Sequence, residues 1–181
     1  MTKTEENLKT AFAGESQARN KYDYFAKVAR KEGLLYVAKI FEETAENEKQ
    51  HAKDEFKLLK GIGDTKANLQ TAIEGEHYEN SEMYPKFAEE ADKEGNREAS
   101  ILFRQIAKVE KEHEERYRKL LEMVKNGTVF KREKPIRWKC SKCGFIHTGK
   151  TPPEKCPSCR HPKEYFEPEC MCFREGCEAC G

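Results

Sequence analysis

Apolar positions recur at spacings of three and four residues through residues 4–125, which is the periodicity of amphipathic α-helices. The two halves of this region align with each other, since AFAGESQARNKY corresponds to AIEGEHYENSEMY and AENEKQH to AKVEKEH. The pattern predicts four helices built as a duplicated helical pair. Charged residues make up 37% of the chain, which fits long helices with solvated outer faces.

Each half carries a glutamate that is followed roughly 33 residues later by Glu-x-x-His. The glutamate and histidine of Glu-x-x-His lie on one face of a helix, one turn apart, so both can coordinate the same ion. Carboxylates and imidazoles in this order are what a four-helix bundle needs to hold two metal ions in its core. The residues are Glu15, Glu48, His51, Glu76, Glu110 and His113.

A chain this rich in glutamate can contain Glu-x-x-His by chance. A third instance, Glu74 and His77, has no counterpart in the repeat, and we interpret it as chance. The doubled motif favours metal binding, because unpaired carboxylates on a core-facing stripe would be costly to bury.

The repeat also predicts where the turns lie. If Glu15 and Glu48 are level on antiparallel neighbours, the turn falls near residues 31–33, where the sequence offers Gly33. The midpoint of the second pair is residue 93, close to Gly95.

One extra residue enters the third helix, because the alignment offset is 61 at Glu76 and 62 from Phe87 onward. A single insertion in a helix is commonly absorbed as a π-bulge, so we expect a π-bulge, or a kink from Pro85, between these residues. Glu79 lies one turn from Glu76 and is a seventh candidate ligand. Its counterpart is Ala18, so the site should be asymmetric and could offer one ion two alternative positions.

Tyr22 and Tyr84 follow Glu15 and Glu76 by about two turns, on the same helix face. They can simply pack in the core. Alternatively, they can donate hydrogen bonds to the ligand carboxylates and orient them.

All eight cysteines lie after residue 139. Two Cys-x-x-Cys pairs can supply four thiolates to one tetrahedral metal, either iron as a one-electron carrier or zinc as a structural ion. The four residues are Cys140, Cys143, Cys156 and Cys159. A further group could bind a third metal or form a flexible or redox-active end; it consists of Cys170, Cys172, Cys177 and Cys180.

We expect four parts along the chain. They are a helical bundle over 1–126, a linker over 127–136, a cysteine module over 137–167 and a cysteine-rich tail over 168–181. The formal net charge is +1 with signs interspersed, so no basic surface for nucleic acid is indicated. No apolar run is long enough to span a membrane and no secretion signal is evident, so we expect a cytoplasmic protein.

Taken together, these segments resemble the rubrerythrin family: GESQARNKY, ENEKQH, GEHYENSEMYP, VEKEH, WKCSKCGFIH and PEKCPSCRHP. The resemblance covers residues 1 to about 167. It implies a mainly α fold, with a ferritin-like four-helix bundle and a small rubredoxin-like metal-binding β domain. It also implies a non-haem di-iron site with the six glutamate and histidine residues above plus Glu79 as ligands, an iron at the four cysteines, and catalytic roles for Glu79, Tyr22 and Tyr84.

The implied activity is reduction of hydrogen peroxide in defence against oxidative stress, with electrons from NAD(P)H arriving through a reductase or a rubredoxin. Two other interpretations remain open. An iron-oxidising, iron-buffering protein would take up iron without an electron donor. A regulator with a structural zinc ion in the cysteine module would lack the red colour of a rubredoxin-type iron.

The connection between the copies, GIGDTKA, is short. Six or seven extended residues reach roughly 20 to 25 Å, whereas a helix of 28 residues is about 42 Å long. The connection is therefore too short for the crossover that a ferritin-like bundle needs. The bundle is either a plain up-and-down arrangement or, as we favour, a homodimer in which chains exchange their helical pairs after the second helix.

Overall fold

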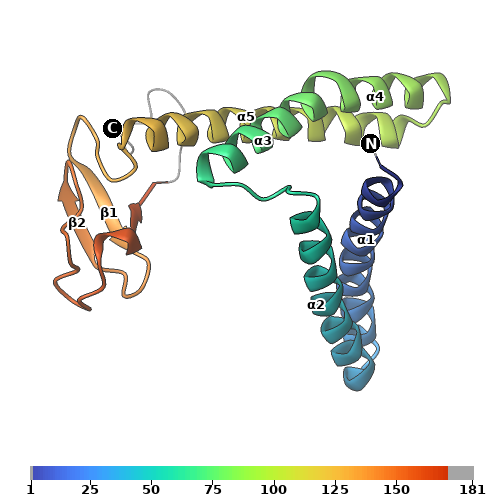
Figure 1. The fold of residues 1–181 in the computed structure, drawn as a ribbon, viewed down its shortest axis with the longest axis horizontal. Helices are drawn as coiled ribbons and strands as arrows, with labels where there is room; N and C mark the ends of the chain where they lie inside the picture. Colours follow the sequence, from blue (N-terminus) through green and yellow to red (C-terminus); the bar gives the residue numbers. More distant parts are fainter. Residues whose placement is uncertain (1, 171–181) are drawn as a thin grey trace. The chain divides into compact units, whose positions relative to one another are not determined.

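The computed structural model describes residues 2–170. The chain divides between Gly63 and Asp64 into two compact units. Figure 1 shows the elements, and the expected fold class, mainly α with a small β module, is confirmed. The helices and strands are α1 (Lys3–Lys31), α2 (Leu35–Leu58), α3 (Thr65–Tyr78), the π-helical turn η1 (Glu79–Met83), α4 (Tyr84–Lys93), α5 (Arg97–Asn126), β1 (Ile136–Cys140), β2 (Ile146–Gly149), the 3₁₀ turn η2 (Lys163–Tyr165) and β3 (Phe166–Pro168).

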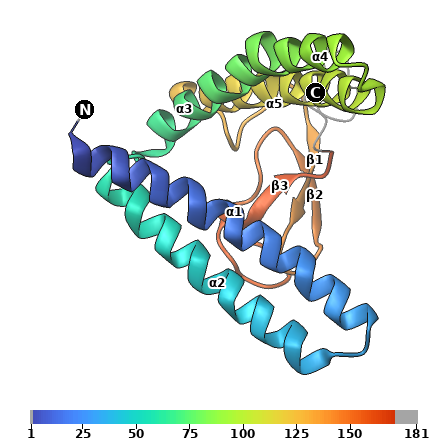
Figure 2. The same cartoon turned by 90° about the vertical axis from the view of Figure 1, so that its right-hand side faces the viewer.

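The first unit is an antiparallel pair of helices, α1 and α2, which lie side by side in both views (Figures 1 and 2). Thr2 and Glu5 cap the start of α1 with reciprocal side-chain-to-backbone hydrogen bonds. The helix ends where Gly33 takes a φ of +79° and the Leu34 N–H returns to the Ala29 carbonyl at 2.9 Å. The predicted turn is confirmed.

The second unit repeats this arrangement with α3, η1 and α4 as one interrupted helix beside α5. Gly95 adopts a φ of +75° at its turn, as predicted. The π-helical turn begins three residues after Glu76, and the Tyr84 N–H donates to the Glu79 carbonyl, five residues back. The extra residue of the repeat is therefore accommodated as a π-bulge, as expected, rather than by a kink at Pro85.

Within each helical pair, a narrow seam of small side chains lies between the two helices. Buried alanines at 26, 29, 38, 45 and 52 hold α1 and α2 close together, and Ala88, Ala91 and Ser100 occupy equivalent positions in the second pair. One ion pair is repeated with its charges exchanged: Arg30 donates to Glu42 at 2.7 Å, and Arg104 donates to Asp92 at 2.7 Å. Both helical pairs therefore use the same packing plan with different side chains.

The cysteine module is a three-stranded antiparallel sheet in the order β2-β1-β3. Its core is formed by Ile136, Trp138, Cys140, Cys156 and Phe166. The Trp138 indole is fully buried and donates a hydrogen bond to the Gly149 carbonyl at 2.9 Å. This core is small. A metal bound by the cysteines would therefore supply much of the free energy of folding.

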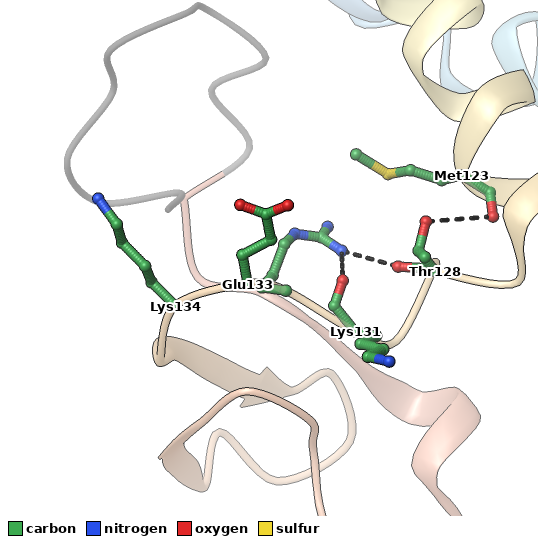
Figure 3. Close-up of a pocket in the computed structure, with 6 residues that line it drawn as sticks. Met123, Thr128, Lys131, Glu133 and Lys134 are labelled. Atoms are coloured by element: carbon green, nitrogen blue, oxygen red, sulfur yellow. Dashed lines mark hydrogen bonds between the residues drawn. The ribbon is translucent and has the colours of Figure 1, made fainter.

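The segment expected to be a linker is attached to the module at several points. Phe130 packs against the module core, the Arg132 N–H donates to the Lys150 carbonyl, and the Arg132 guanidinium lies 5.3 Å from the centre of the Trp138 ring. The same guanidinium donates to the carbonyls of Thr128 and Lys131 (Figure 3). A pocket of about 560 Å³ lies here, lined by Met123, Thr128, Lys131, Arg132, Glu133 and Lys134.

Two further expectations concern the ends and the surface. The cysteine tail lies outside the described residues beyond Cys170, so its metal-binding role stays a prediction. In the described part of the chain, no helix combines the length and apolarity needed to cross a membrane.

Candidate metal centres

The first triad is formed where α1 faces α2. The His51 Nδ1 lies 2.9 Å from a Glu48 carboxylate oxygen and 3.8 Å from a Glu15 oxygen. One ligand atom from each residue can be chosen so that all lie within 4.8 Å of one another. The side chain of His51 is 60% exposed, so the triad is open on one side.

The second triad repeats this geometry on α3 and α5. The His113 Nδ1 lies 2.6 Å from a Glu110 oxygen and 3.7 Å from a Glu76 oxygen. The His113 side chain is more covered than His51, with 37% exposed. The structure therefore brings all six residues of the doubled motif into two matching groups.

Glu79 stands apart from these groups. It lies at the first position of η1, is half-buried, and does not belong to the close group of Glu76, Glu110 and His113. Its charge nevertheless reaches the site, because it contributes to raised pKa values of Glu76 and Tyr84. The sequence placed Glu79 one turn from Glu76; the structure puts it on the irregular turn.

The carboxylates of each triad perturb each other. A hydrogen bond with Glu48 raises the pKa of Glu15, and burial and the Glu48 charge act in the same direction. The same hydrogen bond lowers the pKa of Glu48, so Glu15 is the member of the pair that is protonated first as the pH falls. Burial, followed by the hydrogen bond with Glu110, raises the pKa of Glu76. Adjacent carboxylates that disfavour each other's charge are suited to a cation, which removes their mutual repulsion.

The two tyrosines belong to repeated aromatic clusters. Tyr22 lies 6.1 Å from Phe41 between ring centres, and Tyr84 lies 6.1 Å from Phe103. Burial raises the pKa of Tyr84, and the charges of Glu79, Glu110 and Glu76 raise it further. Both rings therefore pack among aromatic neighbours, and a hydrogen bond from either hydroxyl to a ligand carboxylate stays a prediction.

The four cysteine sulfurs of the module lie within 4.8 Å of one another. The sulfurs of Cys140 and Cys159 are 3.7 Å apart and those of Cys143 and Cys156 are 3.6 Å apart. A tetrahedron with metal–sulfur bonds of about 2.3 Å has edges of about 3.8 Å, so the group has the dimensions of a tetrahedral metal site.

The thiols of this group differ in acidity. The Phe145 backbone N–H is the largest influence on Cys143 and lowers its pKa to about 7. At Cys159 the His161 backbone N–H acts in the same direction, but burial and the neighbouring thiols outweigh it and raise the pKa to about 12. Cys143 is exposed, whereas Cys140 and Cys156 are buried. Cys143 is therefore the most exposed of the four residues, and Cys159 is intermediate.

A polar cluster beside the second triad was not anticipated. Glu114 is buried and accepts hydrogen bonds from Asn80 at 2.8 Å and from the Arg118 Nε at 2.8 Å. The His77 Nδ1 lies 3.2 Å from the same carboxylate. Burial raises the pKa of Glu114, but the hydrogen bonds from Asn80, Arg118 and His77 outweigh it, and the pKa lies below its ordinary value. The repeat contained a signal, because the counterpart of Glu114 is Ala52.

The chain is similar to known proteins over most of its length. The rubrerythrin family profile matches residues 6–121, and the profile of the rubredoxin-like domain of rubrerythrin matches residues 138–167. A rubrerythrin of Porphyromonas gingivalis is 50% identical, with 92% of this chain and 90% of that protein covered. A rubrerythrin of Nitratidesulfovibrio vulgaris is 46% identical, with 92% and 94% covered. Nigerythrin from the same organism is 37% identical, with 90% and 85% covered.

Proposed function

Since the chain belongs to the rubrerythrin family, we propose that it reduces hydrogen peroxide to water at a di-iron centre and receives its electrons through an iron held by four cysteines. The observation that carries this proposal is the combination of two matched carboxylate–histidine triads with a tetrahedral thiolate group in one chain. Iron storage alone has no need of the thiolate group. We place the enzyme in the cytoplasm, where thiolate ligands stay reduced.

The donor set fits two hard ions with one imidazole each. The ligands we assign are Glu15, Glu48, His51, Glu76, Glu79, Glu110 and His113. When bound, a pair of ferrous ions supplies the two electrons that, with two protons, convert one peroxide into two waters. The chain's own part is to hold the carboxylates and imidazoles of the two triads in place. The charges of three glutamates contribute to the raised pKa of Tyr84, which supports a role for this residue beside the bound substrate.

The thiolate group is suited to relay single electrons. Cys143 is exposed and gives an external donor a route to the metal, while Cys140 and Cys156 are fully buried in the module core. We propose that NAD(P)H supplies the electrons through a partner reductase or a rubredoxin-type protein. An iron held by these four cysteines would supply single electrons to the ions held by the two triads.

Replacing one buried thiolate tests the relay. The Cys156→Ser variant should lose reductase-driven peroxide turnover, yet a chemically reduced sample should still be oxidised by one equivalent of peroxide. Steady-state donor oxidation and a stopped-flow single turnover measure the two activities. Ser141→Ala, at an exposed residue of the same module, is the control and should keep both. Loss of both activities in Cys156→Ser with an intact di-iron centre would refute the relay.

Each triad offers three protein ligands, which is too few for a pair of ions. We propose that two chains exchange helical pairs, so that each di-iron site receives Glu15, Glu48 and His51 from one chain and the second triad with Glu79 from the other. Two observations support this assembly. The first is the length of the connection between α2 and α3, which consists of residues 59–64. A crossover within one chain would have to run the length of α2, whose 24 residues are about 36 Å long, and six residues are too short for that distance.

The second observation is the amount of apolar surface on the helical pairs. Tyr24, Val28, Tyr36 and Ile40 are each at least 43% exposed on the first pair. On the second pair the side chains of Ile101, Leu102 and Val109 are at least 50% exposed. Apolar patches of this kind mark interaction surfaces, and a four-helix bundle formed from two chains would cover them.

A further inference from the structure

Glu114 stands where the packing plan of the helical pairs calls for a small apolar residue. Its counterpart Ala52 is buried in the seam of α1 and α2, in line with Ala38 and Ala45. Glu114 is itself only 8% exposed. A carboxylate at such a position is costly unless it is fully paired, so a specific reason for its presence should be found in what it contacts.

The contacts of Glu114 lead to the π-helical turn. One carboxylate oxygen accepts from the Asn80 Nδ2 at 2.8 Å, and the Asn80 Nδ2 also lies 2.6 Å from the backbone carbonyl of Glu76. The other oxygen accepts from the Arg118 guanidinium, which holds the carboxylate in its orientation. A chain of hydrogen bonds therefore runs from α5 through Asn80 to the backbone of a candidate metal ligand.

Within residues 2–170, this connection lies beside the second triad and has no counterpart beside the first. The residues of the first pair that correspond to Asn80, Glu114 and Arg118 are Arg19, Ala52 and Phe56. There the ring of Phe56 stacks on that of Phe12, with 4.8 Å between the ring centres, and α1 continues as a regular helix. The polar cluster and the π-helical turn occur together, in the same half of the repeat.

We propose that Glu114 and Asn80 are positioning residues that fix the backbone at Glu76, and that they make the second triad the tighter of the two metal-binding groups. Asn80 lies on the π-helical turn that directly follows α3, so its hydrogen bonds to Glu114 and to the Glu76 carbonyl tie this turn to α5 and to the last turn of α3. Groups that orient metal ligands are commonly worth a factor of about 10 to 100 in metal affinity. The inference rests on the proposed di-iron centre and is independent of the reaction with peroxide.

Stepwise binding of Mn(II) to the full-length, metal-free protein tests the proposal. Mn(II) suits carboxylate and imidazole ligands and is disfavoured by thiolates, and its electron paramagnetic resonance signal reports the free ion. The wild-type protein should bind two ions in steps of different affinity, and His113→Ala should remove the tighter step. Glu114→Ala and Asn80→Ala should each weaken that step about 10- to 100-fold and leave the weaker step unchanged.

Two further variants separate positioning from a general loss of structure. Glu114→Gln keeps the volume and an acceptor for Asn80, so it should restore most of the tighter step. Glu115→Ala, at the exposed neighbouring residue, should bind as the wild type does. Hydrogen exchange should show faster exchange of the amides at 79–84 in Glu114→Ala, with the helix content of the protein unchanged.

The outcomes distinguish this inference from the proposed function. Equal weakening of both steps in Glu114→Ala, or no weakening of either, overturns the positioning role while leaving the di-iron centre intact. A wild-type protein that binds no pair of ions overturns the di-iron centre and the inference with it.

Discussion

At the scale of single residues, the neighbouring carboxylates of each triad dominate the chemistry. In the metal-free protein the hydrogen bond between Glu15 and Glu48 holds the pKa of Glu15 above its ordinary value of 4.5 and that of Glu48 below it. The pKa of Glu76 is raised as well, first by burial and then by the hydrogen bond with Glu110. A raised pKa means that folding favours the protonated carboxyl, so its contribution to stability is present at low pH and is lost as the pH rises through the folded-state pKa.

The thermal stability of the metal-free protein should therefore fall as the pH rises above 4.5 toward neutrality. Glu15→Gln cannot ionise at this position and should make the melting temperature less dependent on pH in that window. Glu114, whose pKa is lowered, should act only below the window. Calorimetric scans across the pH range measure the effect, and added Mn(II) should raise the melting temperature more at pH 7 than at pH 5. A wild-type melting temperature that rises across the window would contradict this account.

At the scale of elements, the two turn glycines set the length of the helical pairs and thereby keep the triad residues level. Gly33 and Gly95 adopt φ values of +79° and +75°, and a Cβ atom added at either would meet no atom within 4 Å. The requirement for glycine is therefore conformational rather than steric.

Gly33→Ala should destabilise the metal-free protein by about 1 to 2 kcal/mol, because alanine is strained in the left-handed region. Gly33→Asn should cost less, since asparagine tolerates this conformation better. Gly14→Ala is the matched control: Gly14 lies inside α1 with open space around it, and the change should stabilise by about 1 kcal/mol. Chemical denaturation of the three variants gives the comparison, and a neutral Gly33→Ala would argue against the assigned turn.

The same elements show how far the sequence could take the prediction. The turns and the π-bulge followed from counting, because level ligands fix the midpoint of a helical pair and an inserted residue must be absorbed. Glu114 was missed although its counterpart Ala52 signalled it, because a charge on a helix rich in glutamate looks like part of the solvated face. The sequence did not predict that Phe130 and Arg132 contact the module. Glycine, proline and charged residues dominate this segment and are typical of a linker, and a single phenylalanine did not change that interpretation.

At the scale of the whole molecule, the proposed exchange of helical pairs can be tested with heterodimers of two variant chains. One chain carries Glu48→Ala with His51→Ala, and a second chain carries Glu110→Ala with His113→Ala. In an exchanged heterodimer, one site receives both damaged triads and the other receives both intact triads. Without exchange, every site contains one damaged triad.

Co-expressed and doubly affinity-purified heterodimers should therefore bind one pair of Mn(II) ions, whereas either variant alone should bind none as a pair. Equilibrium sedimentation should show a dimer for the wild type. Heterodimers that form but bind no ion pair would show that each site is built from a single chain.

The proposed function is tested most directly by donor-dependent turnover of the iron-loaded protein. Under anaerobic conditions, NAD(P)H, a reductase and a rubredoxin-type donor are supplied, peroxide is added in repeated pulses, and donor oxidation and protein-bound iron are measured together. A parallel reaction receives oxygen in place of peroxide. We expect one peroxide to be consumed for every two electrons over many turnovers. Donor oxidation should be slower with oxygen than with peroxide. The amount of protein-bound iron should stay constant throughout. Net iron uptake with no dependence on the donor would contradict it and identify an iron-buffering protein instead.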